Sequence, residues 1–136
     1  MAARVYKISE INPTIDNLSV RVRVMRLWTM LSYGSSLLPY AIEMIWLDED
    51  GGKIHAVIKR NLVSRFVNAS KEGDAYQITN FEVKLNGGNF RFTKHKYVID
   101  LDHRTNVRRL RESNIPQYAF SFEDFDKINA VGSFKR

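Results

Sequence analysis

The spacing of apolar residues changes twice along this chain, and the order of the changes restricts the folds that it can adopt. Apolar and polar residues alternate in five segments, which predicts strands because successive strand side chains point to opposite faces. One intervening segment places Leu62, Val63, Phe66 and Val67 at helical spacing, which predicts an amphipathic helix of about three turns. The predicted elements are strands at 18–28, 40–48, 54–59, 75–85 and 87–100 and a helix at 59–70.

Residues that favour turns separate these elements. Gly, Ser and Pro in 31–39 predict a loop, and the turn residues of 48–53 predict that the second and third strands form a hairpin. Gly73 is expected to end the helix, and the Asn-Gly-Gly run at 86–88 is expected to make a tight hairpin turn. A serine N-cap followed by aromatic residues at helical spacing predicts a short C-terminal helix at 121–128.

Three strands, one helix and two strands, in this order, are the elements of the OB-fold. This fold is an all-β, five-stranded Greek-key barrel that binds oligonucleotides on the face of its second and third strands and with two loops. We expect this barrel here, with the helix between the third and fourth strands. Residues 1–110 are assigned to the OB-fold domain, and residues 111–136 to a C-terminal extension that either packs on the barrel or is partly flexible.

The composition is that of a globular protein. A length of 136 residues, with 44% hydrophobic residues, is enough for one domain with a real core. No apolar run approaches the roughly 18 residues of a membrane helix, and residues 1–13 contain no apolar segment of the kind found in secretory signals. The absence of cysteine excludes disulfides and thiolate metal sites and suits a reducing compartment.

Motifs of catalytic sites are not recognisable in the sequence. There is no Walker loop, nucleophile elbow or HExxH motif. His55, His95 and His103 do not have a metal-binding spacing, and Asp100 and Asp102 lack the partner carboxylates that a nuclease metal site would need. We therefore expect no catalysis, no cofactor and no metal.

Positive charge is concentrated in one part of the chain. The net charge is +6, and the segment from Lys84 to Arg111 holds eight cations and two acids, which accounts for the whole excess. A patch of this kind suits a polyanionic partner, although a solvated basic surface would give the same count. The cations are Lys84, Arg91, Lys94, Lys96, Arg104, Arg108, Arg109 and Arg111.

Aromatic and cationic side chains are combined on one face of the predicted fifth strand. Alternation places Phe90, Phe92, Lys94 and Lys96 on this face. Binding of single-stranded nucleic acid needs both types, because bases stack on flat apolar rings while cations contact the phosphates. There are structural alternatives: Phe90 could cap the barrel end, Phe92 could pack under the C-terminal segment, and the lysines could be solvated.

The third strand contributes further candidates. His55 and Lys59 alternate with Ile54, Ala56 and Ile58, so the two polar residues face away from the core. Arg108 to Arg111, with the sequence RRLR, is interpreted as a weak nuclear-localisation cluster, a patch that tracks a nucleic-acid strand, or a solvated surface. Both tryptophans, at positions 28 and 46, are expected in the core.

Several segments resemble a known family. ISEINP before the first strand, DEDGGKIHAVIKR across the hairpin, EGDAYQITNFEVK in the fourth strand and NFRFTKHKYVIDL in the fifth resemble a DNA-binding OB domain of the replication protein A large subunit. VRVMRLW and IEMIWLDEDGGKIHA are similar to the plant branch, in which short proteins carry one such domain. The resemblance covers about residues 5–110 and is spread over many positions.

The resemblance implies a binding site. Phe90 stands where the family stacks a base at the opening of the fifth strand, and Lys84 stands where a basic residue late in the fourth strand contacts phosphate. His55 replaces an arginine early in the third strand. Lys59 replaces the second stacking aromatic, so Lys59 and Arg60 are expected to contact phosphate and to make the site more electrostatic.

Two hypotheses about function follow. The first is a nuclear OB domain that binds single-stranded DNA, or less readily RNA, in replication or repair, with protein partners of a replication-protein-A-like complex. The second is an OB module that binds proteins and has lost strong DNA binding, which the absence of the third-strand aromatic favours. The site residues expected under the first hypothesis are Phe90, Lys84, Lys59, Arg60, His55, Phe92, Lys94 and Lys96.

Overall fold

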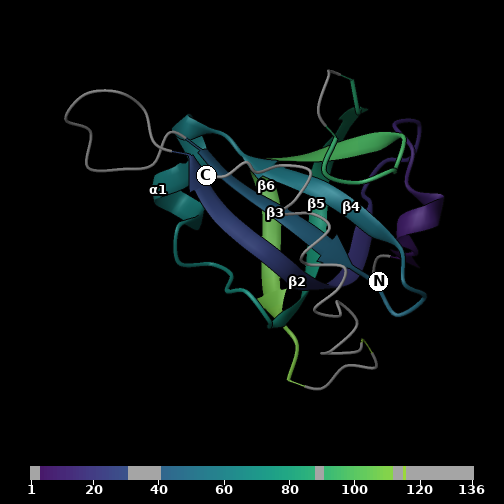
Figure 1. The fold of residues 1–136 in the computed structure, drawn as a ribbon, viewed down its shortest axis with the longest axis horizontal. Helices are drawn as coiled ribbons and strands as arrows, with labels where there is room; N and C mark the ends of the chain where they lie inside the picture. Colours follow the sequence, from purple (N-terminus) through teal and green to yellow (C-terminus); the bar gives the residue numbers. More distant parts are fainter. Residues whose placement is uncertain (1–3, 31–40, 88–90, 112–114, 116–136) are drawn as a thin grey trace.

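In the described residues, six strands form one sheet that closes on itself. The computed structural model describes residues 4–30, 41–87, 91–111 and 115. The strand order is β1-β2-β3-β4-β6-β5, and a further pairing of β2 with β5 closes the barrel (Figure 1). The elements are β1 Val5–Tyr6, a 3₁₀ turn Ile8–Glu10, β2 Ser19–Met30, β3 Ala41–Leu47, β4 Lys53–Ile58, α1 Arg60–Phe66, β5 Ala75–Leu85 and β6 Tyr97–Arg109.

The pairing of these strands confirms the predicted OB-fold. β2, β3 and β4 form an antiparallel meander, β4 then pairs in parallel with β6, and β5 lies between β6 and β2. In chain order, the helix α1 comes between β4 and β5, which are the third and fourth strands of the barrel, as expected. It lies at left in Figure 1. The structure adds the short strand β1 and the 3₁₀ turn, which the sequence analysis did not predict.

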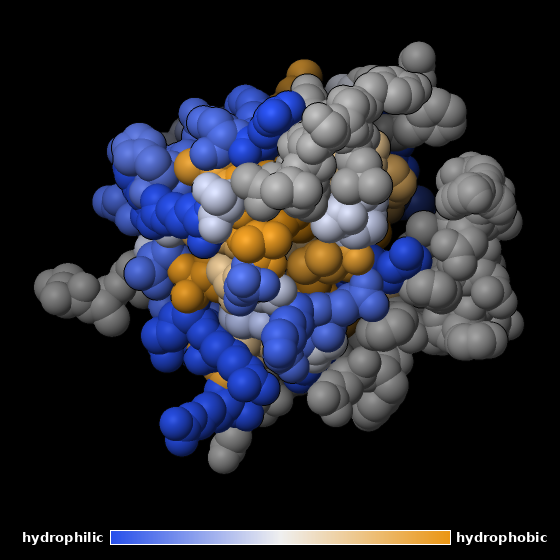
Figure 2. All heavy atoms as spheres, turned by 90° about the vertical axis from the view of Figure 1, so that its left-hand side faces the viewer, coloured by the Kyte–Doolittle hydropathy of each residue, from blue (hydrophilic) through white to orange (hydrophobic). Residues whose placement is uncertain are grey.

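Alternation along the strands fills the barrel as the sequence predicts. Val20, Val22 and Val24 of β2 are fully buried, and so are Ile54 and Ala56 of β4. Burial of such side chains stabilises a fold by about 1.5–3 kcal/mol each relative to exposure. Trp46 also lies in the core, with 0% of its surface exposed. On the side of the molecule that is at left in Figure 1, Figure 2 shows apolar residues bordered by hydrophilic ones.

The helix is shorter than the periodicity predicted. It ends at Phe66, and Gly73 is not its cap but part of the turn before β5, where its φ of +93° suits glycine. Val63 and Phe66 are buried, whereas Val67 is 38% exposed. The buried apolar side chains of this segment therefore end at Phe66, after two turns. Tertiary packing, more than helix propensity, supports helices of this length.

The expected tight hairpin between β5 and β6 is wrong. Leu85 pairs with Tyr97, and the described residues 86–87 and 91–96 belong to a connection between the two strands, while the strand expected from residue 87 begins at Tyr97. The buried side chain of Asn86 explains the difference, because its Nδ2 donates hydrogen bonds to the carbonyl oxygens of Thr93 (3.2 Å) and His95 (2.8 Å). These carbonyls are then engaged by a side chain and not by a neighbouring strand.

Some predictions fall outside the described residues. These are the loop at 31–39 and the C-terminal helix at 121–128. Ile115 is described, is 5% exposed and packs on the barrel, while the division at residue 110 stays a prediction. Among the described helices, none has the length and apolarity that crossing a membrane requires.

Asp48 organises the predicted turn between β3 and β4. Its buried carboxylate accepts hydrogen bonds from the backbone N–H groups of Ile8 (2.8 Å), Gly52 (2.8 Å) and Asp50 (3.1 Å). Gly51 adopts a φ of +87°, as the turn residues of the sequence predicted. One side chain thus joins the hairpin to the 3₁₀ turn that precedes β2.

We expect Asp48→Ala to lower the free energy of unfolding by about 1–3 kcal/mol, because it leaves buried N–H groups without an acceptor. Urea denaturation followed by tryptophan fluorescence measures this change. Asp48→Asn keeps one carbonyl oxygen and should lose less stability. Equal stability of the wild type and Asp48→Ala would show that water replaces the carboxylate at this turn.

Candidate nucleic-acid interface

A bulge in β2 brings Trp28 to the outer face of the barrel. The register between β2 and β3 shifts between Val24 and Arg26, so the alternation reverses and Trp28 pairs with Glu43, which faces outward. Trp28 is therefore half-buried on the outside, and its predicted place in the core is wrong. The bulge itself carried no signal in the sequence that we recognised.

Three rings form an aromatic cluster on this outer face. The ring of Trp28 stacks on that of His55 from β4, with centroids 6.1 Å apart and planes inclined by 10°. Phe92 packs against both, at 5.0 Å from Trp28 and 5.1 Å from His55. Since Phe92 is still 39% exposed, the cluster keeps an apolar ring open to solvent.

Glu43 fixes the orientation of His55. The Oε1 atom of Glu43 lies 2.7 Å from Nε2 of His55, and both side chains are mostly buried. Hydrogen bonding to the imidazole and stacking on Trp28 together restrict the ring of His55. Glu43 and Trp28 are the two members of this site that the sequence analysis missed.

The connection that carries Phe92 is anchored at its base. His95 Nδ1 accepts a hydrogen bond from the backbone N–H of Tyr97 (3.0 Å), so Nε2 carries the proton that is donated to the carbonyl oxygen of Ile8 (2.8 Å). With the Asn86 bonds, this contact ties the connection to the barrel and to the segment before β2. The ring of Phe92 is thereby held on the outer face.

Two lysines share one carboxylate beside the aromatic cluster. Asp100, in β6 between β4 and β5, has only 7% of its side chain exposed, and its Oδ2 lies 2.7 Å from Nζ of Lys84 and 3.1 Å from Nζ of Lys59. The hydrogen bond to this carboxylate raises the pKa of Lys84 above its ordinary range. The group of three keeps one net positive charge, with both ammonium groups half-exposed.

Lys84 reaches this face because of a second bulge. Asn80, with a φ of +63°, interrupts the register between β5 and β6, so Phe81 faces the core while Glu82 and Lys84 face outward. Lys84 therefore faces outward, although strict alternation from Ile78 would have put it inside. Asn80 was not singled out in the sequence.

The remaining predicted residues lie around this face or outside the described chain. Arg60 is the exposed first residue of α1, directly after Lys59. Lys94 and Lys96 are exposed in the connection before β6 and not in a strand. Phe90 lies outside the described residues, and β6 begins at Tyr97.

A second apolar cluster covers the neighbouring part of the outer face. Met25, Ile45 and Leu47 are each 1% exposed although they point away from the core, and Ile115 packs on them. The buried guanidinium of Arg23 donates to the carbonyl oxygen of Ile115 from Nη2 (2.8 Å) and Nε (3.3 Å). This part of the face is thus covered, and the open part lies toward Phe92.

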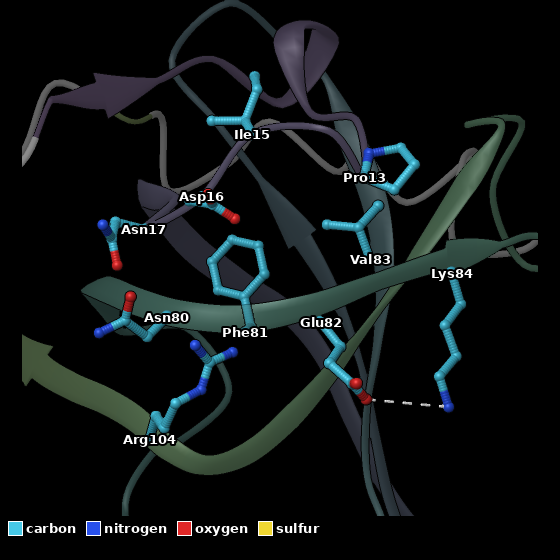
Figure 3. Close-up of a pocket in the computed structure, with 10 residues that line it drawn as sticks. All are labelled: Pro13, Ile15, Asp16, Asn17, Asn80, Phe81, Glu82, Val83, Lys84 and Arg104. Atoms are coloured by element: carbon cyan, nitrogen blue, oxygen red, sulfur yellow. Dashed lines mark ion pairs between the residues drawn. The ribbon is translucent and has the colours of Figure 1, made fainter.

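A pocket of about 240 Å³ lies at another edge of β5 (Figure 3). Phe81, whose ring belongs to the core, is one of the residues that line it, and the side chains of Asn17 and Asn80 face each other at its rim. Both charge signs line the pocket, with Asp16 and Glu82 against Lys84 and Arg104. Because Phe81 is 6% exposed, the pocket has no open ring on which a base could stack.

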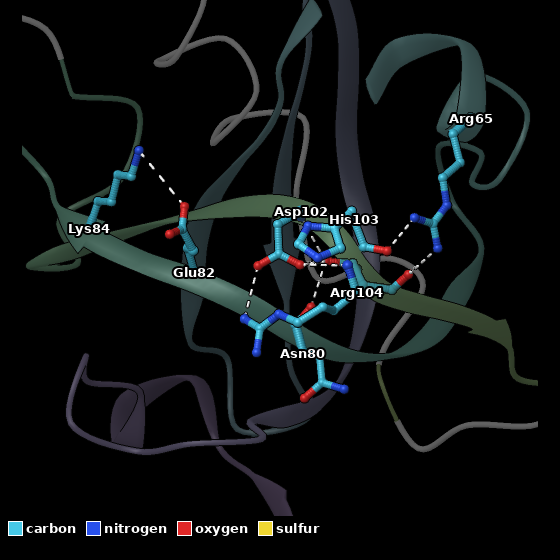
Figure 4. A network of polar contacts seen from close by, with 8 residues as sticks. Arg65, Asn80, Glu82, Lys84, Asp102, His103 and Arg104 are labelled. Atoms are coloured by element: carbon cyan, nitrogen blue, oxygen red, sulfur yellow. Dashed lines mark hydrogen bonds and ion pairs between the residues drawn. The ribbon is translucent and has the colours of Figure 1, made fainter. Parts of the chain in front are cut away.

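The two acids of β6 are both engaged by cations. Asp102 accepts hydrogen bonds from the Arg104 backbone N–H (2.8 Å) and from its guanidinium (3.0 Å), as Figure 4 shows. Burial by itself raises the pKa of Asp102, but these bonds hold it below its usual range. Within the described residues, no group of three or more His, Cys, Asp or Glu side chains could hold a metal ion.

The domain is a closed OB barrel, and its outer face carries an open aromatic cluster beside the ammonium groups of Lys59 and Lys84. Residues 9–130 match the model of the family described as "Domain of unknown function DUF223". The chain belongs to this family. The match runs past residue 110, where the sequence analysis placed a boundary.

Comparison with known proteins confirms the resemblance to replication protein A. Over 131 residues the chain is 24% identical to a 70 kDa DNA-binding subunit of replication protein A from Arabidopsis thaliana, and the match covers 94% of this chain and 21% of the relative. The chain thus spans about a fifth of the length of this curated relative.

Solved structures share the fold at low sequence identity. A replication protein A heterotrimer bound to single-stranded DNA superimposes with a TM-score of 0.66 and 20% identity, covering 82% of this chain and 26% of that one. DNA-binding domain A of S. cerevisiae replication protein A has a TM-score of 0.58 and 20% identity, covering 82% and 98%.

We expect Asp100→Asn to lower the pKa of Lys84 toward the ordinary value of about 10.4, because the carboxylate that favours the ammonium form is removed. In the wild type the raised pKa stabilises the fold below about pH 10.4, and this contribution is lost as the pH rises through the pKa of the folded state. NMR titration of the Lys84 side chain measures the pKa. Glu82→Gln is the matched control, since Glu82 lies 4.0 Å from Lys84 and should change the pKa less. An unchanged pKa in folded Asp100→Asn would contradict the assignment.

Proposed function

We propose that this domain binds single-stranded DNA on the outer face of β3 and β4, without catalysis. The observation that carries the proposal is the half-exposed ring of Phe92, held on Trp28 and His55 beside the ammonium groups of Lys59 and Lys84. Stacking faces and cations are the two components that sequence-tolerant binding of single strands requires. The DNA-binding subunit and the DNA-bound complex among the similar proteins support this choice.

The arrangement suggests how a strand would lie. One base would stack on Phe92, and the strand would continue past His55 toward Lys59, Lys84 and Arg60. Lys94 and Lys96 would contact phosphates from the connection that carries Phe92. Since Lys59, and not an aromatic residue, directly follows β4, phosphate contacts would contribute more of the affinity than stacking.

The cellular role follows from the resemblance. We propose a nuclear function in DNA replication or repair, with protein partners of the replication protein A type, because the curated relative is a replication protein A subunit. Selection of DNA over RNA would depend on contacts to the ribose 2′-OH. A protein-binding OB module is the second candidate, favoured by the engagement of Lys59 and Lys84 by Asp100.

Phe92→Ala should weaken binding of single-stranded DNA by about 1–3 kcal/mol, or about 5- to 150-fold in Kd, because one stacked base is lost. Fluorescence anisotropy with labelled single-stranded DNA at two salt concentrations measures this, with duplex DNA and RNA of equal length for comparison. Val67→Ala is the control, since Val67 is similarly exposed at the end of α1. Unchanged affinity in folded Phe92→Ala, with Phe90→Ala also unchanged, would exclude stacking and favour the protein-binding candidate.

Asp100→Asn should strengthen the binding of single-stranded DNA at low salt. The slope of log K against log salt concentration should become steeper by about 0.7 for each additional phosphate neutralised. The reason is that Asp100 competes with phosphate for the ammonium groups of Lys59 and Lys84. The same anisotropy titration, repeated over a salt series, measures the slope. Weaker binding by a folded variant would instead mean that Asp100 positions the two lysines for the strand.

A further inference from the structure

Two arginines converge on one neutral atom on a different part of the barrel wall. Where β5 lies between β2 and β6, Gln77 is opposite Arg21 on one side and opposite Arg108 on the other. Arg21 Nε donates to Oε1 of Gln77 at 3.0 Å, and Arg108 Nη2 donates to the same oxygen at 2.9 Å. The two guanidinium groups are therefore brought to either side of one amide oxygen.

The charges of this pair are not neutralised. Arg21 and Arg108 are exposed, and in the described part of the chain neither has a carboxylate partner. Lys84 and Arg104 differ in this respect, since Lys84 is paired with Asp100 and Arg104 with Asp102. Each guanidinium has five N–H donors, of which Gln77 engages one, so donors for an anion remain.

The amide of Gln77 is oriented for this role. Its Nε2 donates to Oγ of Ser19 at 3.2 Å, which leaves Oε1 facing the two arginines. Ser19 is fully buried and its hydroxyl also contacts Oγ1 of Thr79 at 3.0 Å. The hydroxyl groups of Ser19 and Thr79 thus fix the amide of Gln77. This amide in turn orients the two guanidinium groups before any ligand binds.

The chemistry of the surroundings points to phosphate. In the next row across the same three strands Ser19 is buried, while half-buried Thr79 and exposed Asn106 continue the polar surface with a hydroxyl and an amide. Arginine with Ser, Thr, Asn and Gln is the set that contacts phosphate and sugar in nucleic-acid complexes, without reading sequence. Neither row contains an aromatic ring for stacking or an apolar residue to bury a peptide side chain.

We propose that Arg21 and Arg108, oriented by Gln77, form a second nucleic-acid contact that binds backbone phosphates on the wall made by β2, β5 and β6. The choice of nucleic acid as the partner rests on the proposed function, whereas the anion site rests on the arginine geometry. A strand longer than the first face would continue onto this wall. Because the site contacts only phosphates, it accepts a duplex as well as a long single strand, whereas a short strand is held by the first face.

The test compares three probes with the Arg21→Ala/Arg108→Ala double variant. The probes are a single strand of ~8 nucleotides, which one OB face accommodates, a single strand of ~30 nucleotides and a duplex of ~20 base pairs. We expect Kd for the long strand and the duplex to rise by up to about thirtyfold, as two exposed ion pairs allow. The log–log salt slope for the long strand should fall by about 1.4, and binding of the short strand should be unchanged.

Two further variants make the outcome specific. Lys53→Ala/Lys71→Ala removes the same charge elsewhere, and an equal loss in this control would overturn the proposal in favour of net charge. Gln77→Glu keeps both arginines and supplies a carboxylate, so it should weaken long-strand and duplex binding while the fold is retained. Normal binding by folded Gln77→Glu and by the double variant would also overturn the proposal.

Failure of this proposal can be distinguished from failure of the proposed function. Phe92→Ala should weaken binding of the short strand and leave the duplex unaffected, which is the converse of the arginine variant. If the wild type binds duplex through Arg21 and Arg108 but does not bind the short strand, the second site stands and the first face fails. If the short strand binds and the arginine variant matches the wild type on all probes, only the second site fails.

Discussion

The structure depends on β2 pairing with both β5 and β3, in addition to the short strand β1. Its first half pairs with β5 and its second half with β3, and this double pairing closes the barrel. A strand can turn from one neighbour to the other only if it bends, and the bulge between Val24 and Arg26 lies where the change occurs. Closure of the barrel buries the valines of β2. The bulge exchanges the inward and outward positions of the residues that follow it.

The cations on the two walls of the barrel differ in whether a carboxylate compensates their charge. Beside Phe92, the ammonium groups of Lys59 and Lys84 share the buried carboxylate of Asp100, so their charge is partly compensated and an incoming phosphate must compete for them. On the wall made by β2, β5 and β6, the arginines share only an amide oxygen.

The aromatic cluster shows how the fold converts separate residues into one surface. Trp28, His55 and Phe92 come from β2, β4 and the connection before β6, and no two of them are near in sequence. Each is held by a contact outside the cluster or by its neighbours: Glu43 fixes His55, and Asn86 with His95 fixes the connection. The open ring of Phe92 is therefore supported by a rigid base, which lowers the ordering cost of binding.

The sequence by itself determined the order of strands and helix, the inward faces of β2 and β4, and the hairpin at Asp48, because alternation and turn chemistry are local properties. The outward positions of His55 and Lys59 followed from the same alternation. Only the tertiary structure decided which wall Trp28 and Lys84 reach, since the bulges that reverse the alternation arise where strands from distant parts of the chain pair. The meeting of Asp100 with two lysines, and of Gln77 with two arginines, was likewise decided by cross-strand register. Register depends on how the whole barrel closes, and no segment read alone contains it.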